Sequence, residues 1–417
     1  MEKIGHLKYS ILRHQEMYFL VFALFGYIVA YIDPYDSKVF PPYINLFIRG
    51  TVFILSLYFI KKNFSILKER KATVFLFIIF FLFHFFKLYI SLPNITALNT
   101  QALYNLKNAI YYYGFVVIPA PVIAILSLNY QIIDFKKFCQ IVFWFLLTLL
   151  CINFLHTNFI FEDYNSNGRS GIFRAYYIFV GHYGLSLVVL SIYLYSFLGL
   201  KNYKYIIGIF LGLFPIYVSA ARSPILALLV ILFIFLILLN NKKYWLYFFY
   251  FLSLSILVLF VIYKSKIGEN FIFFKRLNMA VFERNASGRS FYLNKGLDIF
   301  IKHPILGKDA IFEDGMYPHN LFIEILMSTG LLGMALFIIY FKFVVKSFFK
   351  VLRNIYKYKE SGILIFFFLQ YFILAQTSGS LYSSFEFWYF GAAVIGLGYI
   401  NFTNEEIKSN NRRGNTA

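Results

Sequence analysis

The sequence predicts an all-α, polytopic transmembrane helical bundle with about 12 spans, and three observations support this prediction. Of the 417 residues, 60% are apolar and only 14% are charged, whereas soluble domains are roughly 45–50% apolar and about 25% charged. The mean hydropathy is +0.69. The chain also contains a series of apolar runs near the roughly 20 residues that one bilayer crossing requires. A soluble domain is therefore excluded.

Charged or turn-rich breaks separate these runs and define the expected spans. They lie near residues 17–32, 43–60, 72–91, 109–128, 138–156, 175–198, 203–220, 223–240, 244–263, 319–341, 361–379 and 384–402. This pattern divides the chain into nine spans over 1–263, a large loop over 264–318, three spans over 319–402 and a tail over 403–417.

The basic residues predict which side of the membrane each loop occupies. The net charge is +20, which in a soluble chain would suggest nucleic acid. Here 23 of the 39 Lys and Arg residues fall in the termini and in alternate short loops, whereas the loops opposite are nearly free of them. The positive-inside rule therefore predicts cytoplasmic termini and an outer 264–318 loop. We expect membrane lipids as surroundings and no nucleic-acid partner.

The 264–318 loop is the only sizeable polar segment, and loops of this length are often functional. Within it, apolar residues recur among polar ones over 289–302, after possible caps at Asn285 and Ser287. We expect a short helix here that lies at the membrane surface.

The sequence lacks signatures of nucleotide hydrolysis, zinc catalysis or a serine nucleophile, because GxxxxGK[ST], HExxH, CxxC and GxSxG are all absent. Polar residues instead gather at the outer ends of the spans. Arg222 precedes Pro224 in a tight turn, Arg289 lies in the large loop, and His319 and Asn320 follow Pro318. Arg169 and Arg174 lie in the other outer loop.

These residues suit the binding of an anion at the membrane surface. Guanidinium groups bind phosphate bidentately, and helix N-termini add N–H donors. The alternative for the arginines is that they only extend to lipid phosphates. The alternative for His319 is that it is simply a polar residue at the membrane interface. Glu324 lies one helical turn after Asn320 and is a candidate for substrate binding. Arg49 and Lys87 lie toward the outer ends of their spans and are candidates for a function, but extension to the interface explains their position equally well.

Several of these segments together resemble the O-antigen polymerase and O-antigen ligase superfamily of bacterial membrane glycosyltransferases. The resemblance rests on Ser287-Gly288-Arg289-Ser290, His303-Pro304-Ile305-Leu306-Gly307, Pro318-His319-Asn320 and Gly330-Leu331-Leu332-Gly333. Gly168 to Phe173 and Ser219 to Ser223 resemble two earlier segments of the family. Gly307-Lys308-Asp309 departs from the family pattern, which often has a second glycine.

The resemblance implies a GT-C-type enzyme of the bacterial inner membrane, with its active site facing the periplasm and no metal or other cofactor. Its substrate would be an undecaprenyl-diphosphate-linked oligosaccharide, and a chain-length regulator (a polysaccharide co-polymerase) is a compatible partner. Arg222 and Arg289 would hold the leaving diphosphate, and His319 would accept or orient the proton of the attacking hydroxyl. Arg169 and Arg174 would help to bind diphosphate or glycan, with Asn320 and Glu324 beside them as substrate-binding residues.

Three functions stay open at this point. A polymerase would join repeat units, which we favour because no segment is specific to lipid A–core recognition, and a ligase would transfer the finished glycan to lipid A–core. A flippase for lipid-linked oligosaccharides can have a similar number of spans. Transporters commonly show internal repeats and broken helices near the bilayer midplane. Here the polar groups gather at one face and around one large loop, which favours an enzyme.

Overall fold

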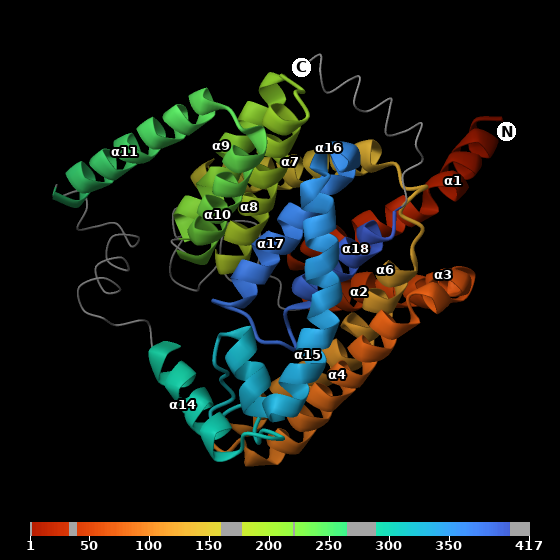
Figure 1. The fold of residues 1–417 in the computed structure, drawn as a ribbon, viewed down its shortest axis with the longest axis vertical. Helices are drawn as coiled ribbons and strands as arrows, with labels where there is room; N and C mark the ends of the chain where they lie inside the picture. The colour runs from red at the N-terminus through yellow and green to blue at the C-terminus, as the bar shows by residue number, and fades with distance from the viewer. Residues whose placement is uncertain (1, 33–39, 160–176, 220–221, 265–288, 401–417) are drawn as a thin grey trace. The chain divides into compact units, whose positions relative to one another are not determined.

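The computed structural model describes residues 2–32, 40–159, 177–219, 222–264 and 289–400 (Figure 1). In these ranges the regular structure is helical. Eight helical segments are long and apolar enough to cross a membrane, and Tyr203–Ser219 and Phe385–Gly398 are shorter apolar helices. Of the two remaining expected spans, 17–32 covers the second part of α1 and the 3₁₀ segment after it, and 244–263 lies within α11. The predicted polytopic helical membrane protein is confirmed.

The helices follow the apolar runs in chain order. Their bounds are α1 (Glu2–Phe25), α2 (Phe40–Lys62), α3 (Phe64–Glu69), α4 (Lys71–Ser91), α5 (Thr100–Tyr111), α6 (Pro119–Ser127), α7 (Phe135–Phe159), α8 (Tyr177–Ile192), α9 (Tyr203–Ser219), α10 (Arg222–Leu239), α11 (Lys242–Lys264), α14 (Arg289–Lys302), α15 (Leu321–Arg353), α16 (Ile355–Tyr358), α17 (Ile363–Ala375) and α18 (Phe385–Gly398). A 3₁₀ segment, η1 (Gly26–Tyr31), extends α1. The helix expected over 289–302 is confirmed as α14, whereas its possible caps Asn285 and Ser287 lie outside the described residues.

The fourth span starts earlier than its apolar run. It covers Thr100–Ser127 rather than 109–128, because Asn99 caps α5 by accepting the N–H of Ala102 at 2.8 Å. A π-helical segment, η3 (Tyr112–Val117), and Pro119 then join α5 to α6. The polar first turns of α5 hid this start from a search for apolar residues.

The tenth span is not the continuous helix expected over 319–341. Gly330 interrupts α15 with φ 62° and ψ −159°, and the helix then continues to Arg353. The part after the break, residues 331–353, is itself long enough to cross a bilayer. The part before it, residues 321–329, is a short separate helix whose first residues follow His319.

Contacts divide the chain into two compact units. One contains residues 1–145, 172–174 and 292–417, and the other contains 146–171 and 175–291. In the first unit α18 is buried along nearly its whole length, and α15, α17 and α6 pack against it. In the second unit α8 packs closely on α9, because Gly184 and Gly212 face each other and neither has a Cβ. A Cβ on either glycine would clash with the carbonyl oxygen of the other.

Candidate functional site

The segment that leads to His319 is fixed in the break of α15. The N–H groups of Leu331 and Leu332, which begin the second part of α15, donate to the carbonyls of Pro304 and Ile305 at 2.8 and 3.1 Å. On the other side of the break, Lys308 N donates to Met327 O at 2.9 Å. The backbone of residues 304–308 thus satisfies backbone groups that the break exposes.

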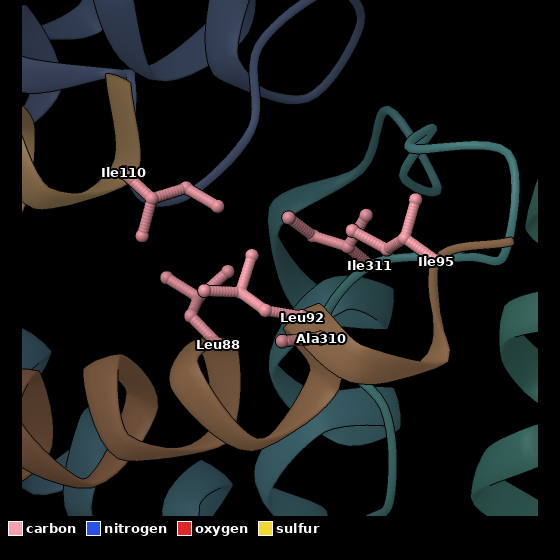
Figure 2. Close-up of a cluster of buried hydrophobic side chains, with 6 residues drawn as sticks. All are labelled: Leu88, Leu92, Ile95, Ile110, Ala310 and Ile311. Atoms are coloured by element: carbon pink, nitrogen blue, oxygen red, sulfur yellow. The ribbon is translucent and has the colours of Figure 1, made fainter. Parts of the chain in front are cut away.

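Apolar packing holds the next part of this segment against α4. Figure 2 shows a buried cluster that joins the end of α4 and the following loop to residues 310–311 of the large loop. It consists of Leu88, Leu92, Ile95, Ile110, Ala310 and Ile311. Ala310 N donates to Ser91 Oγ at 2.8 Å, and Thr96 N and Ala97 N both donate to Glu313 O at 3.1 Å. The backbone before His319 is therefore anchored by apolar and polar contacts together.

His319 lies in an aromatic setting at the start of the short helix. Its φ of 56° is in the left-handed region, which is uncommon for a non-glycine residue and is found at functional sites. The Tyr317 ring centroid lies 4.4 Å from the imidazole, and the Tyr292 ring of α14 lies 6.4 Å from it. Tyr292 donates to Asp314 Oδ2 at 2.7 Å, and this hydrogen bond, with some burial, raises the pKa of Tyr292. Two tyrosine rings thus lie close to His319, and one of them is bonded to an aspartate.

Asn320 and Glu324 have different surroundings from those expected for groups that contact a substrate directly. The Asn320 side chain accepts the N–H groups of Phe322 and Ile323, both at 3.1 Å, and so caps the short helix. Glu324 is fully buried, and its two carboxylate oxygens accept Leu381 N at 3.0 and 2.9 Å. Both side chains fix the short helix that follows His319.

A buried histidine that carries no sequence motif lies beside Glu324. His84 Nε2 of α4 lies 3.9 Å from Glu324 Oε1, and His84 Nδ1 lies 3.2 Å from Ser328 Oγ. The contact joins α4 to α15, which lie side by side (Figure 1). Because His84 is separated from Glu324 by 240 residues of sequence, no local pattern could indicate this pair.

The second unit carries two of the predicted arginines. Arg222 is exposed and is the first residue of α10, while Arg289 is half-buried and is the first residue of α14. Ser219, the last residue of α9, and Pro224 of α10 both lie close to α8, because a Cβ on Gly181 would lie 2.7 Å from Ser219 Oγ and 3.5 Å from Pro224 Cγ. Each arginine is therefore at a helix N-terminus, where the free backbone N–H groups of the first turn favour the binding of an anion. Arg169 and Arg174 lie outside the described residues.

One comparison with known proteins bears on these positions. A family model described as O-antigen ligase matches residues 207–338. This match places residues 207–338 in the O-antigen ligase/polymerase superfamily. A search of curated proteins finds no match. The superfamily is a group of glycosyl-transfer proteins of bacterial membranes, and the matched range contains Arg222, Arg289 and the whole segment from His303 to Gly333.

Two further charged residues lie outside the range that the superfamily model matches. Lys87 Nζ donates to Gly307 O at 3.3 Å and so holds the segment in the break of α15. Arg49 is only 4% exposed, which argues against the alternative that it extends to the interface. Its guanidinium lies over the rings of Phe385, Tyr113 and Tyr27, at 4.2, 5.3 and 5.7 Å.

Proposed function

We propose that the chain is an O-antigen polymerase of the bacterial inner membrane. It would join undecaprenyl-diphosphate-linked repeat units at the periplasmic face and release undecaprenyl diphosphate. The observation that carries the proposal is the placement of His319, which lies within the superfamily match at the head of a short helix fixed by buried contacts. A fixed base beside an aromatic surface suits the activation of a sugar hydroxyl.

The reaction transfers a glycosyl group between oxygen atoms. The acceptor hydroxyl attacks the anomeric carbon of the donor, and its proton passes to His319. The bond between the anomeric carbon and the phosphate oxygen breaks, and the electron pair leaves with the diphosphate. Arg222 and Arg289 would stabilise the charge that develops on this group, with Arg169 and Arg174 as further contacts. Asn320 and Glu324 would serve substrate binding by fixing the His319 helix.

A ligase is the second candidate, because the matching family model carries that description. Deletion of the gene followed by gel analysis of lipopolysaccharide separates the two functions. Loss of a polymerase leaves surface glycan of a single repeat unit. Loss of a ligase leaves polymer on its lipid carrier and none on the surface. Unchanged polymer and surface glycan would contradict both functions, and lipid-linked repeats retained on the cytoplasmic face would indicate a flippase.

A further inference from the structure

The turn between α17 and α18, residues 376–384, lies against the short helix that follows His319. Its sequence is Gln-Thr-Ser-Gly-Ser-Leu-Tyr-Ser-Ser, which contains hydroxyl and amide groups but no charge. The bond from Leu381 N to Glu324 places the turn at the His319 end of α15. The turn therefore carries polar, neutral groups and is bonded to the short helix that follows His319.

Two buried side chains hold this turn in one conformation. Leu381 donates its N–H to the Glu324 carboxylate, and its carbonyl accepts the indole N–H of Trp388 at 3.1 Å. The hydroxyls of Ser380 and Ser383 lie 2.7 Å apart and close the turn further. Both backbone groups of Leu381 are thus satisfied by side chains from α15 and α18. Such preorganisation reduces the entropy lost when a ligand binds.

The first residue of the turn has unused hydrogen-bonding capacity. Both amide atoms of Gln376, Nε2 and Oε1, are buried and have no hydrogen-bond partner among the described residues. Leaving a buried amide unpaired costs free energy, so such groups normally have a partner. Next to it, the hydroxyls of Thr377 and Ser378 donate to the carbonyl of Leu374 at 3.1 and 3.2 Å and retain lone pairs that can accept. A ligand rich in hydroxyls would supply both donors and acceptors.

We infer that the 376–384 turn binds the neutral glycan of the acceptor substrate, with Gln376 as its central hydrogen-bonding residue. The inference rests on the proposed function. A diphosphate does not suit this turn, because phosphate recognition requires cations and the turn has none. The acceptor suits it, since the turn is bonded to the helix whose first residues follow His319, and His319 takes the proton of the acceptor hydroxyl.

The test uses the full chain in lipid nanodiscs and two separate probes. One probe is the repeat-unit oligosaccharide released from its lipid diphosphate by mild acid, and the other is undecaprenyl diphosphate. Gln376→Met keeps the length of the side chain and removes both amide groups. We expect it to weaken oligosaccharide binding by about tenfold or more, the effect of losing two hydrogen bonds of typical strength. Binding of undecaprenyl diphosphate should not change.

Gln101→Met is the matched control, because Gln101 is an exposed amide near the start of α5 and not in the turn. It should alter neither binding constant. If Gln376→Met does not accumulate in the membrane, Gln376→Asn, which keeps the amide but withdraws it by one methylene, should show the same selective loss. Unchanged oligosaccharide binding, or equal loss for both probes, in a folded variant would overturn the inference.

Turnover of the wild-type chain distinguishes a failure of this inference from a failure of the proposed function. A wild type that releases undecaprenyl diphosphate from lipid-linked repeat units, while Gln376→Met binds oligosaccharide normally, refutes the inference alone. A wild type that neither releases undecaprenyl diphosphate nor binds the oligosaccharide refutes the proposed function and the inference with it.

Discussion

Gly307 and Gly330 lie against each other at the break in α15, and both have a φ of 62°. A Cβ on Gly330 would lie 2.6 Å from the nitrogen of Gly307, and a Cβ on Gly307 would lie 2.5 Å from the nitrogen of Thr329. In both cases the atoms that a Cβ would meet are backbone atoms, so no movement of a flexible side chain could relieve the clash. This contact fixes the large loop to the short helix that begins after His319.

Substitution of Gly330 by alanine should destabilise the protein strongly. Gly199 provides the matched control, because its φ is 67° but a Cβ there would meet nothing within 4 Å. Gly199→Ala should cost only the strain of a left-handed alanine, about 1–2 kcal/mol. Gly330→Ala adds a clash with the backbone of residues 305–307. It should therefore lower the unfolding temperature in detergent by more than Gly199→Ala does. Equal shifts for the two variants would mean that the contact between the loop and the helix contributes nothing.

The helices could be predicted from sequence because their signals are local. Apolar runs placed every span, and the periodicity over 289–302 gave the exact bounds of α14. The break at Gly330 was missed, since a glycine followed by leucines reads as one continuous apolar run until its partner segment is known. The burial of Arg49 was missed for the same reason, because its aromatic neighbours come from three separate parts of the chain.

The candidate site was predicted in part. Pattern and resemblance selected His319, Arg222 and Arg289, and these remain predictions. Sequence alone could not assign Asn320 to a cap or Glu324 to the N–H of Leu381, because each role depends on backbone positions. His84 and Gln376 had no signal, since one lies in a uniformly apolar helix and the other in a short neutral turn.

His319→Ala should reduce turnover by about 10²–10⁴-fold, the usual contribution of a positioned base. Binding of the lipid-linked substrate should persist, because the diphosphate contacts are assigned to arginines. The rate of undecaprenyl diphosphate release and substrate affinity are measured on the same preparation. His303→Ala is the control, since His303 is an exposed histidine of the same loop. Normal turnover in His319→Ala would direct the search for a base elsewhere.

Arg222→Ala and Arg289→Ala should each abolish glycan polymerisation without lowering the amount of inserted protein. Lysine at either position should restore only part of the activity, because it supplies a charge without the bidentate fork. Gels of surface glycan and immunoblots of membranes provide the two measurements. Arg353→Ala, at the exposed far end of α15, should behave as wild type. Full activity in both alanine variants would leave lipid contact as their role.

The predicted topology can be tested by labelling with a membrane-impermeant thiol reagent on intact spheroplasts. The two native cysteines, Cys139 and Cys151, are first replaced by serine. A cysteine at exposed Glu313, in the predicted outer loop, should react, whereas one at exposed Ser65, in the predicted cytoplasmic loop, should not. The reverse pattern would place His319 on the cytoplasmic side and contradict a periplasmic reaction.

Arg49 and Glu386 should depend on each other for stability. Both side chains are buried, at 4% and 7% exposure, and they interact electrostatically. Arg49→Met would remove the positive charge that acts on buried Glu386, so this variant should lower the unfolding temperature. The double variant Arg49→Met/Glu386→Gln removes both charges and should recover most of that loss. Thermal unfolding of the four proteins in detergent gives the coupling between the two residues. Additive losses would show that the Arg49 guanidinium is held by Tyr27, Tyr113 and Phe385 rather than by Glu386.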